Sequence, residues 1–115
     1  MHADTDGGRL RPDSEFIDVA AEVFRLLADA TRIRIVLALQ GGAELPVNEL
    51  AEIVDRAPAA VSQHLAKLRW ARVVRVRQAG NRMFYRLSDE HAMRLVAEAV
   101  MQAEHAVEEV PGHHR

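Results

Sequence analysis

The sequence predicts a mainly α-helical (α+β) domain that carries one β-hairpin, and three observations support this class. Apolar residues recur at helical spacing in five separate stretches. Between the fourth and fifth stretches, residues 74–87 alternate instead, around the turn Gln78-Ala79-Gly80-Asn81, as expected of two paired strands. A chain of 115 residues that is 49% hydrophobic suits a single domain with a modest core, which a partner subunit would enlarge. The predicted order of elements is α-α-α-α-β-β-α.

The first predicted helix begins after Asp13 or Ser14, either of which can cap it, with Glu15 in its first turn. Its apolar positions form a broader face than a small core requires. These positions are Phe16, Ile17, Ala20, Val23, Phe24 and Leu27. We therefore predict that this helix is partly core and partly subunit interface. The second helix ends at Gly41-Gly42, a typical carboxyl-terminal signal.

The third and fourth helices are predicted to form a helix-turn-helix. The third covers roughly residues 47–54, with Leu50, Ile53 and Val54 facing inward. A short link joins it to the fourth helix at Pro58, because proline suits the first position of a helix. Two short helices, a tight link and a following hairpin together indicate a winged helix-turn-helix.

The fourth helix has a narrow apolar stripe of Val61, Leu65 and Leu68. Its opposite side presents small and polar residues, as a helix needs if its backbone is to approach base edges in the major groove. These are Ala59, Ser62, Gln63, Ala66 and Lys67. We expect Ser62, Gln63 and Lys67 to contact base edges or nearby phosphates. His64 lies on the flank, where it could contact DNA or support the helix.

Charge is strongly segregated along the chain. Residues 56–88 contain eight Arg or Lys and no Asp or Glu, so the rest has seven of the 15 basic side chains and all 17 acidic ones. This segregation is typical of a surface that binds a polyanion, although a solvated basic face is the simpler alternative. We expect Arg75, Arg77 and Arg82 to contact the DNA backbone around the hairpin.

The last helix is predicted from about residue 90 to 107, capped by Ser88 or Asp89. Its predicted buried side consists of Leu95, Val96, Ala99, Val100, Ala103 and Val107. The domain then covers residues 13–107, between a flexible leader (1–12) and a flexible histidine-containing tail (108–115). His2 in the leader could join the terminal amine in a metal site, but a lone histidine there is more often incidental.

Two histidines on the last helix are candidate metal ligands. His91 and His105 are fourteen residues apart, which separates them by about 40° around the helix and roughly 21 Å along it. One helix therefore cannot bring them to one ion. If two copies pack antiparallel across a two-fold axis, however, His91 of one lies level with Glu104 and His105 of the other, and two equivalent sites arise. Alternatively, these residues are simply solvated.

Several segments together resemble the ArsR/SmtB transcription regulators. They are Ala28-Asp29-Ala30-Thr31-Arg32, Val61-Ser62-Gln63-His64-Leu65-Ala66-Lys67-Leu68, Gly80 and Phe84-Tyr85-Arg86-Leu87. The resemblance covers about residues 19–105 and is nearest to the KmtR-like and NmtR-like nickel and cobalt sensors. It implies a homodimer through the first and last helices, operator DNA as partner and, in most members, a repressor released by metal. Carried over, the implied metal ligands are His91, Glu104, His105, His113 and His114.

Departures from the family narrow the choice of metal. The segment Leu45-Pro46-Val47-Asn48-Glu49-Leu50 lacks the thiolates of some relatives, and Gln102 stands where NmtR-like and SmtB-like sensors have a histidine. Nitrogen and oxygen donors without sulfur suit Ni(II) or Co(II), or Zn(II) at four-coordination. We rank nickel first, cobalt next and zinc third. A second hypothesis keeps the DNA-binding protein but makes the site vestigial, with nickel sensed by a separate partner protein.

Other classes of protein are disfavoured. With no cysteine, the chain has no disulfide, thiolate site or cysteine nucleophile. No Gly-rich phosphate loop or Gly-x-Ser-x-Gly motif appears, so we expect no organic cofactor and no enzyme activity. A metal hydrolase lacks its His-Glu-x-x-His pattern. Without a long apolar run or signal peptide, we expect a cytoplasmic protein with no membrane partner.

Overall fold

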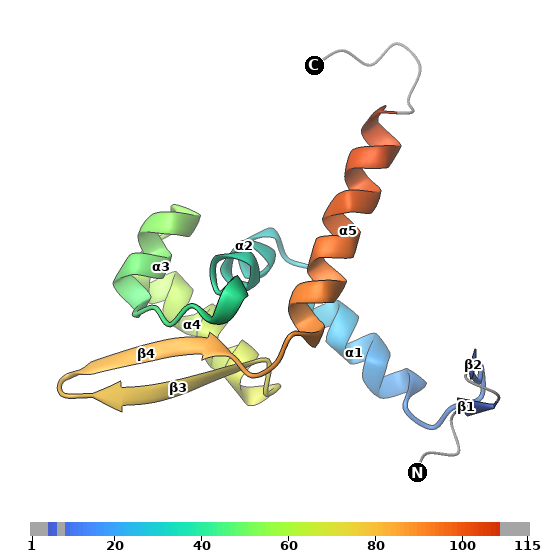
Figure 1. Ribbon diagram of the computed structural model, residues 1–115. Coiled ribbons are helices and arrows are strands. Elements are labelled where there is room, and N and C mark those ends of the chain that lie inside the picture. The colour runs from blue at the N-terminus through green and yellow to red at the C-terminus, as the bar shows by residue number, and fades with distance from the viewer. Residues whose placement is uncertain (1–4, 7–8, 109–115) are drawn as a thin grey trace.

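The computed structural model describes residues 5–6 and 9–108, and it confirms the predicted winged helix-turn-helix (Figure 1). The helices are α1 (Ile17–Leu27), α2 (Ala30–Ala38), α3 (Val47–Val54), α4 (Pro58–Trp70) and α5 (His91–Glu108). The hairpin strands are β3 (Val74–Ala79) and β4 (Arg82–Leu87). Two elements were not predicted: a 3₁₀ turn, η1 (Gln40–Gly42), and a short antiparallel pair, β1 (Thr5–Asp6) with β2 (Arg9–Leu10), within the predicted leader.

The core lies where α2, α3 and α4 meet the start of β3 and of α5. The predicted stripe of α4 is confirmed, since Val61, Leu65 and Leu68 are all 0% exposed. Its partners are apolar residues from every neighbouring element. The fully buried ones before α4 are Ile35 and Val36 on α2, Leu39 directly after α2, and Leu50 on α3. This burial fixes the rotation of α4, and so decides which of its side chains face outward.

The hairpin projects from the core as a two-stranded arm (Figure 1). Its register runs from Val74 opposite Leu87 to Ala79 opposite Arg82, which leaves a two-residue turn. Gly80 occupies that turn with a φ of +62°, a conformation that glycine adopts without a steric penalty. The loop before α3 holds the base of the arm, because Leu45 and Tyr85 exchange backbone hydrogen bonds of 3.0 and 2.9 Å.

The predicted cap of the first helix is wrong. The carboxylate of Asp13 binds Arg11 at 3.1 Å, and the hydroxyl of Ser14 accepts from the backbone N–H of Phe16 at 3.1 Å. Ser14 therefore closes a short turn that precedes the helix, and α1 begins only at Ile17 with no side-chain cap. Glu15 lies before the helix, so Asp18 is the acidic residue of the first turn.

The inward side of α3 also differs from the prediction. Leu50 and Val54 are buried as expected, but Ile53 is 57% exposed and Ala51 is buried in its place. At about 100° per residue, a stripe centred between Leu50 and Ala51 leaves Ile53 more than a quarter-turn away. The small Ala51 is the side chain that lets α3 pack closely against its neighbours, and Ile53 remains on the surface.

Helices α1 and α5 extend away from the winged helix-turn-helix (Figure 1). On α5 only Ala92 and Val96 are buried, so the rest of its predicted buried side is not covered within one protomer. Leu95, Ala99, Val100 and Ala103 are exposed and Val107 is half-buried. Phe16, directly before α1, and Ile17 and Phe24 on α1 are also exposed, by between 44% and 59%. Among the residues that the structure describes, no helix is long and apolar enough to cross a membrane.

Candidate functional site

The outward side of α4 is exposed along its whole length. We call it the recognition face, and it consists of the five residues predicted from the sequence: Ala59, Ser62, Gln63, Ala66 and Lys67. Within the described part of the chain, the side chains of Ser62, Gln63 and Lys67 make no hydrogen bond or ion pair. Their donors and acceptors are therefore available to an external partner, and the small Ala59 and Ala66 allow that partner to approach the backbone.

His64 has a structural contact beside this face. Its ring is half-buried, and its Nδ1 accepts a hydrogen bond of 3.0 Å from Nε of Arg32 at the start of α2. A second nitrogen of Arg32 donates to the carbonyl oxygen of Leu26 at 3.1 Å. The sequence left open whether His64 contacts DNA or supports the helix. The hydrogen bond establishes the supporting contact, and leaves Nε2 as the atom that could contact a ligand.

The cap of α2 lies next to this pair. The carboxylate of Asp29 accepts from the backbone N–H of Arg32 at 3.0 Å. This hydrogen bond is the main reason that the pKa of Asp29 is lowered from its usual 3.8, with a smaller contribution from the positive charge of Arg32. Asp29 therefore fixes the start of α2, and with it the backbone that presents Arg32 to His64.

The hairpin arginines divide into bound and unbound groups. Arg77 binds Glu44, with Nε and a terminal nitrogen at 3.0 and 2.9 Å from the same carboxylate oxygen. Arg86 lies 3.8 Å from the other oxygen of Glu44. The hydrogen bond from Arg77 is the main cause of the lowered pKa of Glu44, whose usual value is 4.5. Arg75, by contrast, makes no ion pair or hydrogen bond through its side chain within the described residues.

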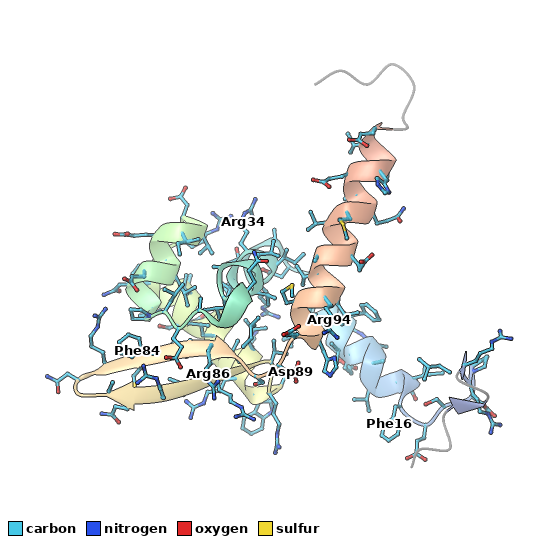
Figure 2. The ribbon with its side chains drawn as sticks, in the orientation of Figure 1. Phe16, Arg34, Phe84, Arg86, Asp89 and Arg94 are labelled. Carbon is cyan, nitrogen blue, oxygen red and sulfur yellow. The ribbon has the colours of Figure 1, made fainter. Side chains whose placement is uncertain are left out.

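Phe84 also orders two arginines near the end of the hairpin. The guanidinium carbons of Arg77 and Arg82 lie 5.0 and 5.4 Å from the centre of its ring, within cation–π range. Figure 2 shows Phe84 on the hairpin, nearer the tip than Arg86. Three arginines were predicted to contact the DNA backbone. Arg75 has no side-chain partner among the described residues, Arg82 lies over Phe84, and Arg77 lies over Phe84 and also binds Glu44.

Sequence reasoning missed Glu44. It is the only acidic residue that pairs with the hairpin in the part of the chain that the structure describes. Thirty-three positions separate it from Arg77. Nothing in the local pattern around Leu45-Pro46 indicates this ion pair. The pair forms only because the loop before α3 is hydrogen-bonded to β4 in the folded protein.

The candidate metal ligands lie on α5. His91, Glu104 and His105 are exposed, with His91 in the first turn and the other two near the end. The backbone N–H of His91 donates to the carboxylate of Asp89 at 2.9 Å, so Asp89, one of the two predicted capping residues, binds the first N–H of α5. No group of three or more potential ligands occurs within the described residues. One protomer therefore does not form the site from these residues alone, although their donor atoms suit a borderline cation.

The remaining ligand candidates cannot be placed. His113 and His114, carried over from the family resemblance, lie outside the described residues, as does His2.

An exposed polar face on the second helix of a helix-turn-helix, beside a basic hairpin, defines a winged helix-turn-helix DNA-binding protein. Comparison with known proteins gives the family. Residues 29–76 match the model of the bacterial regulatory protein, arsR family. The chain is 50% identical over its whole length to the HTH-type transcriptional regulator KmtR of Mycobacterium tuberculosis, covering 86% of that protein. It is 36% identical to the regulator NmtR of the same organism, over 85% of this chain and 84% of NmtR.

A solved structure agrees with these sequence matches. The homodimeric winged helix-turn-helix DNA-binding domain Mb0332 of Mycobacterium bovis superposes with a TM-score of 0.72, at 28% identity, over 95% of this chain and all of that one. The chain therefore belongs to the ArsR/SmtB family of bacterial transcription regulators, as its resemblance to KmtR-like and NmtR-like proteins predicted. Its relatives are DNA-binding regulators and not enzymes.

Proposed function

We propose that this protein is a homodimeric, metal-responsive regulator that binds operator DNA through α4 and the hairpin. The observation that carries the proposal is the recognition face, where Ser62, Gln63 and Lys67 are exposed and make no side-chain hydrogen bond or ion pair within the described residues. In this arrangement Ser62 and Gln63 contact base edges, and Lys67 contacts a base edge or a phosphate. The two α4 helices of a dimer enter successive major grooves of a pseudo-palindromic site.

Dimerisation is supported by the apolar surface that one protomer leaves uncovered. Phe24, Leu27 and Ile33 line an apolar groove of about 280 Å³ together with Leu95 and Ala99 of α5. An exposed apolar surface of this kind is typical of a subunit interface. A second copy with the same surface covers it isologously, and the homodimeric state given for the Mb0332 domain supports this choice of partner.

The proposed effector is Ni(II), with Co(II) as second choice and Zn(II) as third. Its ligands are His91 of one protomer with Glu104 and His105 of the other, and His113 and His114 complete the set. The support is chemical, since these are nitrogen and oxygen donors without a thiolate, and the similarity to KmtR extends over the whole chain. Because each site joins two protomers, metal binding and dimer geometry are coupled.

Coupling of this kind changes DNA affinity without any change in α4 itself. The exposed residues of α4 fit two half-sites only at one separation of the winged domains. A difference of about 1 to 3 kcal/mol between the metal-bound and metal-free geometries alters affinity several-fold or more. DNase footprinting of the gene's own upstream region, with and without nickel, tests this directly. Equal protection in both conditions would contradict metal regulation.

The DNA-binding assignment has a separate test. Gln63→Ala should reduce the preference for operator over random DNA, because it removes a base contact, whereas Arg82→Ala should weaken both DNAs alike, because it removes a phosphate contact. Binding to the two DNAs is measured by fluorescence anisotropy with the metal-free dimer. If both variants lose the same factor on both DNAs, the proposed division between base and backbone contacts is wrong.

A second function is favoured by one specific observation. Gln102 occupies a position on α5 where related sensors have a histidine, so the ligand set of those sensors is incomplete in this chain. In this alternative the protein binds operator DNA, but a separate partner protein detects nickel, and the regulator activates rather than represses. Calorimetric titration of the full-length dimer with Ni(II) separates the two possibilities.

The titration requires matched variants. With a built-in sensor, wild-type protein binds Ni(II) stoichiometrically, His91→Ala abolishes that binding, and Glu108→Ala leaves it unchanged. Glu108 is the control because it is an exposed carboxylate near the end of α5 outside the proposed set. Weak or substoichiometric binding by the wild type, with no difference from His91→Ala, supports the partner-protein alternative.

A further inference from the structure

Three arginines at the junction of α4 and β3 carry positive charge that is unpaired among the described residues. Arg77 and Arg86 on the hairpin contact Glu44, and Arg32 is bound to His64 and Leu26. Arg69, Arg72 and Arg75 differ, because all three are exposed and their guanidinium groups make no hydrogen bond or ion pair within the described residues.

These three arginines line one groove. It has a volume of about 500 Å³, and its other polar side chains are Ser88 and Asp89. We call it the basic groove, after Arg69, Arg72 and Arg75. The carboxylate of Asp89 accepts from the backbone N–H of His91 at the start of α5, and among the described residues it forms no ion pair with an arginine. Three guanidinium groups and one carboxylate line the groove, which leaves a net positive charge, so the groove favours an anion. Guanidinium groups bind phosphate oxygens particularly well, in pairs of parallel hydrogen bonds.

The backbone at Arg72 is a second, independent indication of a function. Arg72 has a φ of +64°, in the left-handed region that disfavours a side chain. It follows the end of α4, at a position where helices commonly place glycine. Nothing in the fold requires arginine at this position, since its guanidinium has no partner within the described residues. When a residue other than glycine occupies this backbone conformation and its side chain has no partner within the protein, we infer that the side chain binds a partner outside the protein.

Trp70 links the basic groove to the recognition face. It is 90% exposed, more than any other exposed large apolar residue that the structure describes. Trp70 follows Gln63 by seven positions, which places it about 20° from Gln63 around the helix and two turns further along. The recognition face therefore continues into an exposed indole, and the two residues that flank the end of α4, Arg69 and Arg72, belong to the groove.

We propose that the basic groove binds a phosphodiester segment of the DNA backbone next to the bases that α4 contacts. Arg69, Arg72 and Arg75 hold the phosphate oxygens, and Trp70 packs against the adjoining sugar. This inference rests on the proposed DNA-binding function and adds a backbone site distinct from the end of the hairpin. Because Ser88 and Asp89 also form the groove, the site adjoins the first turn of α5.

Salt dependence of DNA binding tests the proposal. Each phosphate contact adds about one unit to the slope of log affinity against log salt concentration. The full-length, metal-free dimer is titrated with operator and with random DNA over a series of KCl concentrations. Arg69→Ala and Arg72→Gly should each weaken both DNAs several-fold, by similar factors, and reduce the slope by about one unit. Arg72→Gly is chosen because glycine suits the local backbone, so the variant should fold.

The matched control is Arg34→Ala. Arg34 is exposed and makes no side-chain hydrogen bond or ion pair among the described residues, and Figure 2 shows it on α2, on the side away from the hairpin. This variant should keep the wild-type slope. If Arg69→Ala and Arg72→Gly also keep it while Gln63→Ala loses sequence preference, the basic groove is not a backbone site although the protein binds DNA. If wild-type protein binds neither DNA, the proposed function itself fails.

Trp70 provides a direct measurement at the site, because it is the only tryptophan in the chain. Its fluorescence should change when DNA is added to wild-type protein, and the change should need more DNA in Arg69→Ala. Inorganic phosphate at matched ionic strength should cause no saturable change, since the groove is proposed to bind backbone that α4 positions. Saturation by millimolar phosphate alone would instead identify a site for a free anion and overturn the proposal.

Discussion

Arg32 and His64 form a hydrogen bond of 3.0 Å that joins the start of α2 to the middle of α4. The donor is Nε of the guanidinium, so Nδ1 of the imidazole must be unprotonated. A neutral His64 therefore carries its hydrogen on Nε2, and can only donate from that atom to an external group. Because Arg32 also donates to the carbonyl oxygen of Leu26, one side chain connects the last turn of α1 to the helix that presents the recognition face.

Removing this connection should destabilise the domain. Arg32→Ala deletes two hydrogen bonds from a charged, half-buried donor, so we expect the free energy of unfolding to fall by about 2 kcal/mol. Urea denaturation at fixed protein concentration measures the change. Nitrogen-15 NMR of the imidazole should show the Nε2-protonated tautomer in the wild type and a weaker preference for it in Arg32→Ala.

Arg34→Ala is the control for this experiment, since Arg34 lies two residues away on the same helix, is exposed and makes no side-chain hydrogen bond or ion pair among the described residues. Its unfolding free energy should stay within about 0.5 kcal/mol of the wild type. An equal loss in both variants would mean that removing a positively charged side chain from α2, and not breaking the contact with His64, lowers the stability.

Asp29 should make the start of α2 sensitive to acid. Asp29→Ala removes the side chain that caps α2 and should cost about 1 kcal/mol, whereas Asp29→Asn keeps an oxygen acceptor and should cost less. The pKa of Asp29 is lower in the folded protein than its usual 3.8, so its stabilising contribution is complete above that value and is lost as pH falls through the lowered folded pKa. The urea midpoint is measured from neutral pH down to about pH 3. As the pH falls, the midpoint of the wild type should decrease more than that of Asp29→Asn, because only the wild type loses the contribution of the Asp29 carboxylate.

Glu44 should compete with DNA for two hairpin arginines. It holds Arg77 at 2.9 Å and Arg86 at 3.8 Å, so a phosphate that takes up the same guanidinium nitrogens must replace the carboxylate. Glu44→Gln should therefore raise the affinity for operator and random DNA alike, by a few-fold. Glu49→Gln removes the same charge from an exposed residue with no ion pair among the described residues, and so corrects for the overall change in charge. Equal gains in the two variants would show that the ion pair does not restrain the hairpin.

Local signals in the sequence were sufficient for most of the winged domain. Pro58 predicted the start of α4, the alternation after Val73 predicted the strands, and the single stripe of Val61, Leu65 and Leu68 predicted which side of α4 is exposed. These features depend on periodicity and on turn chemistry, which neighbouring residues determine.

Features that depend on contacts between distant segments were not predicted. Periodicity alone could not show that Ala51 rather than Ile53 faces the core, because both are compatible with a helix and only the packing of α3 decides between them. The Glu44–Arg77 pair and the Arg32–His64 hydrogen bond join residues 33 and 32 positions apart. The left-handed backbone at Arg72 was missed for another reason, since arginine gives no signal for a conformation that glycine usually adopts.

Arg72 provides a test in which stability and DNA binding change in opposite directions. Backbone hydrogen bonds close the end of α4, from Arg72 N–H to the carbonyl of Arg69 at 2.9 Å and from Val73 N–H to that of Leu68 at 2.8 Å, with Arg72 in the left-handed region. Glycine adopts this conformation without steric cost, so Arg72→Gly should raise the free energy of unfolding by up to about 1 kcal/mol, although its greater freedom in the unfolded chain offsets part of the gain.

Arg72→Ala separates backbone strain from charge. Alanine keeps a Cβ in the disfavoured conformation but removes the guanidinium, so it should weaken DNA binding as much as glycine does without the same gain in stability. Urea denaturation and anisotropy titrations of both variants at one salt concentration give the comparison. If alanine stabilises the protein as much as glycine, the gain comes from relief of repulsion between Arg72 and its neighbours Arg69 and Arg75, and the strain at this position is negligible. If neither variant loses DNA affinity, the guanidinium of Arg72 does not contact a DNA phosphate, and the proposed role of this arginine is wrong.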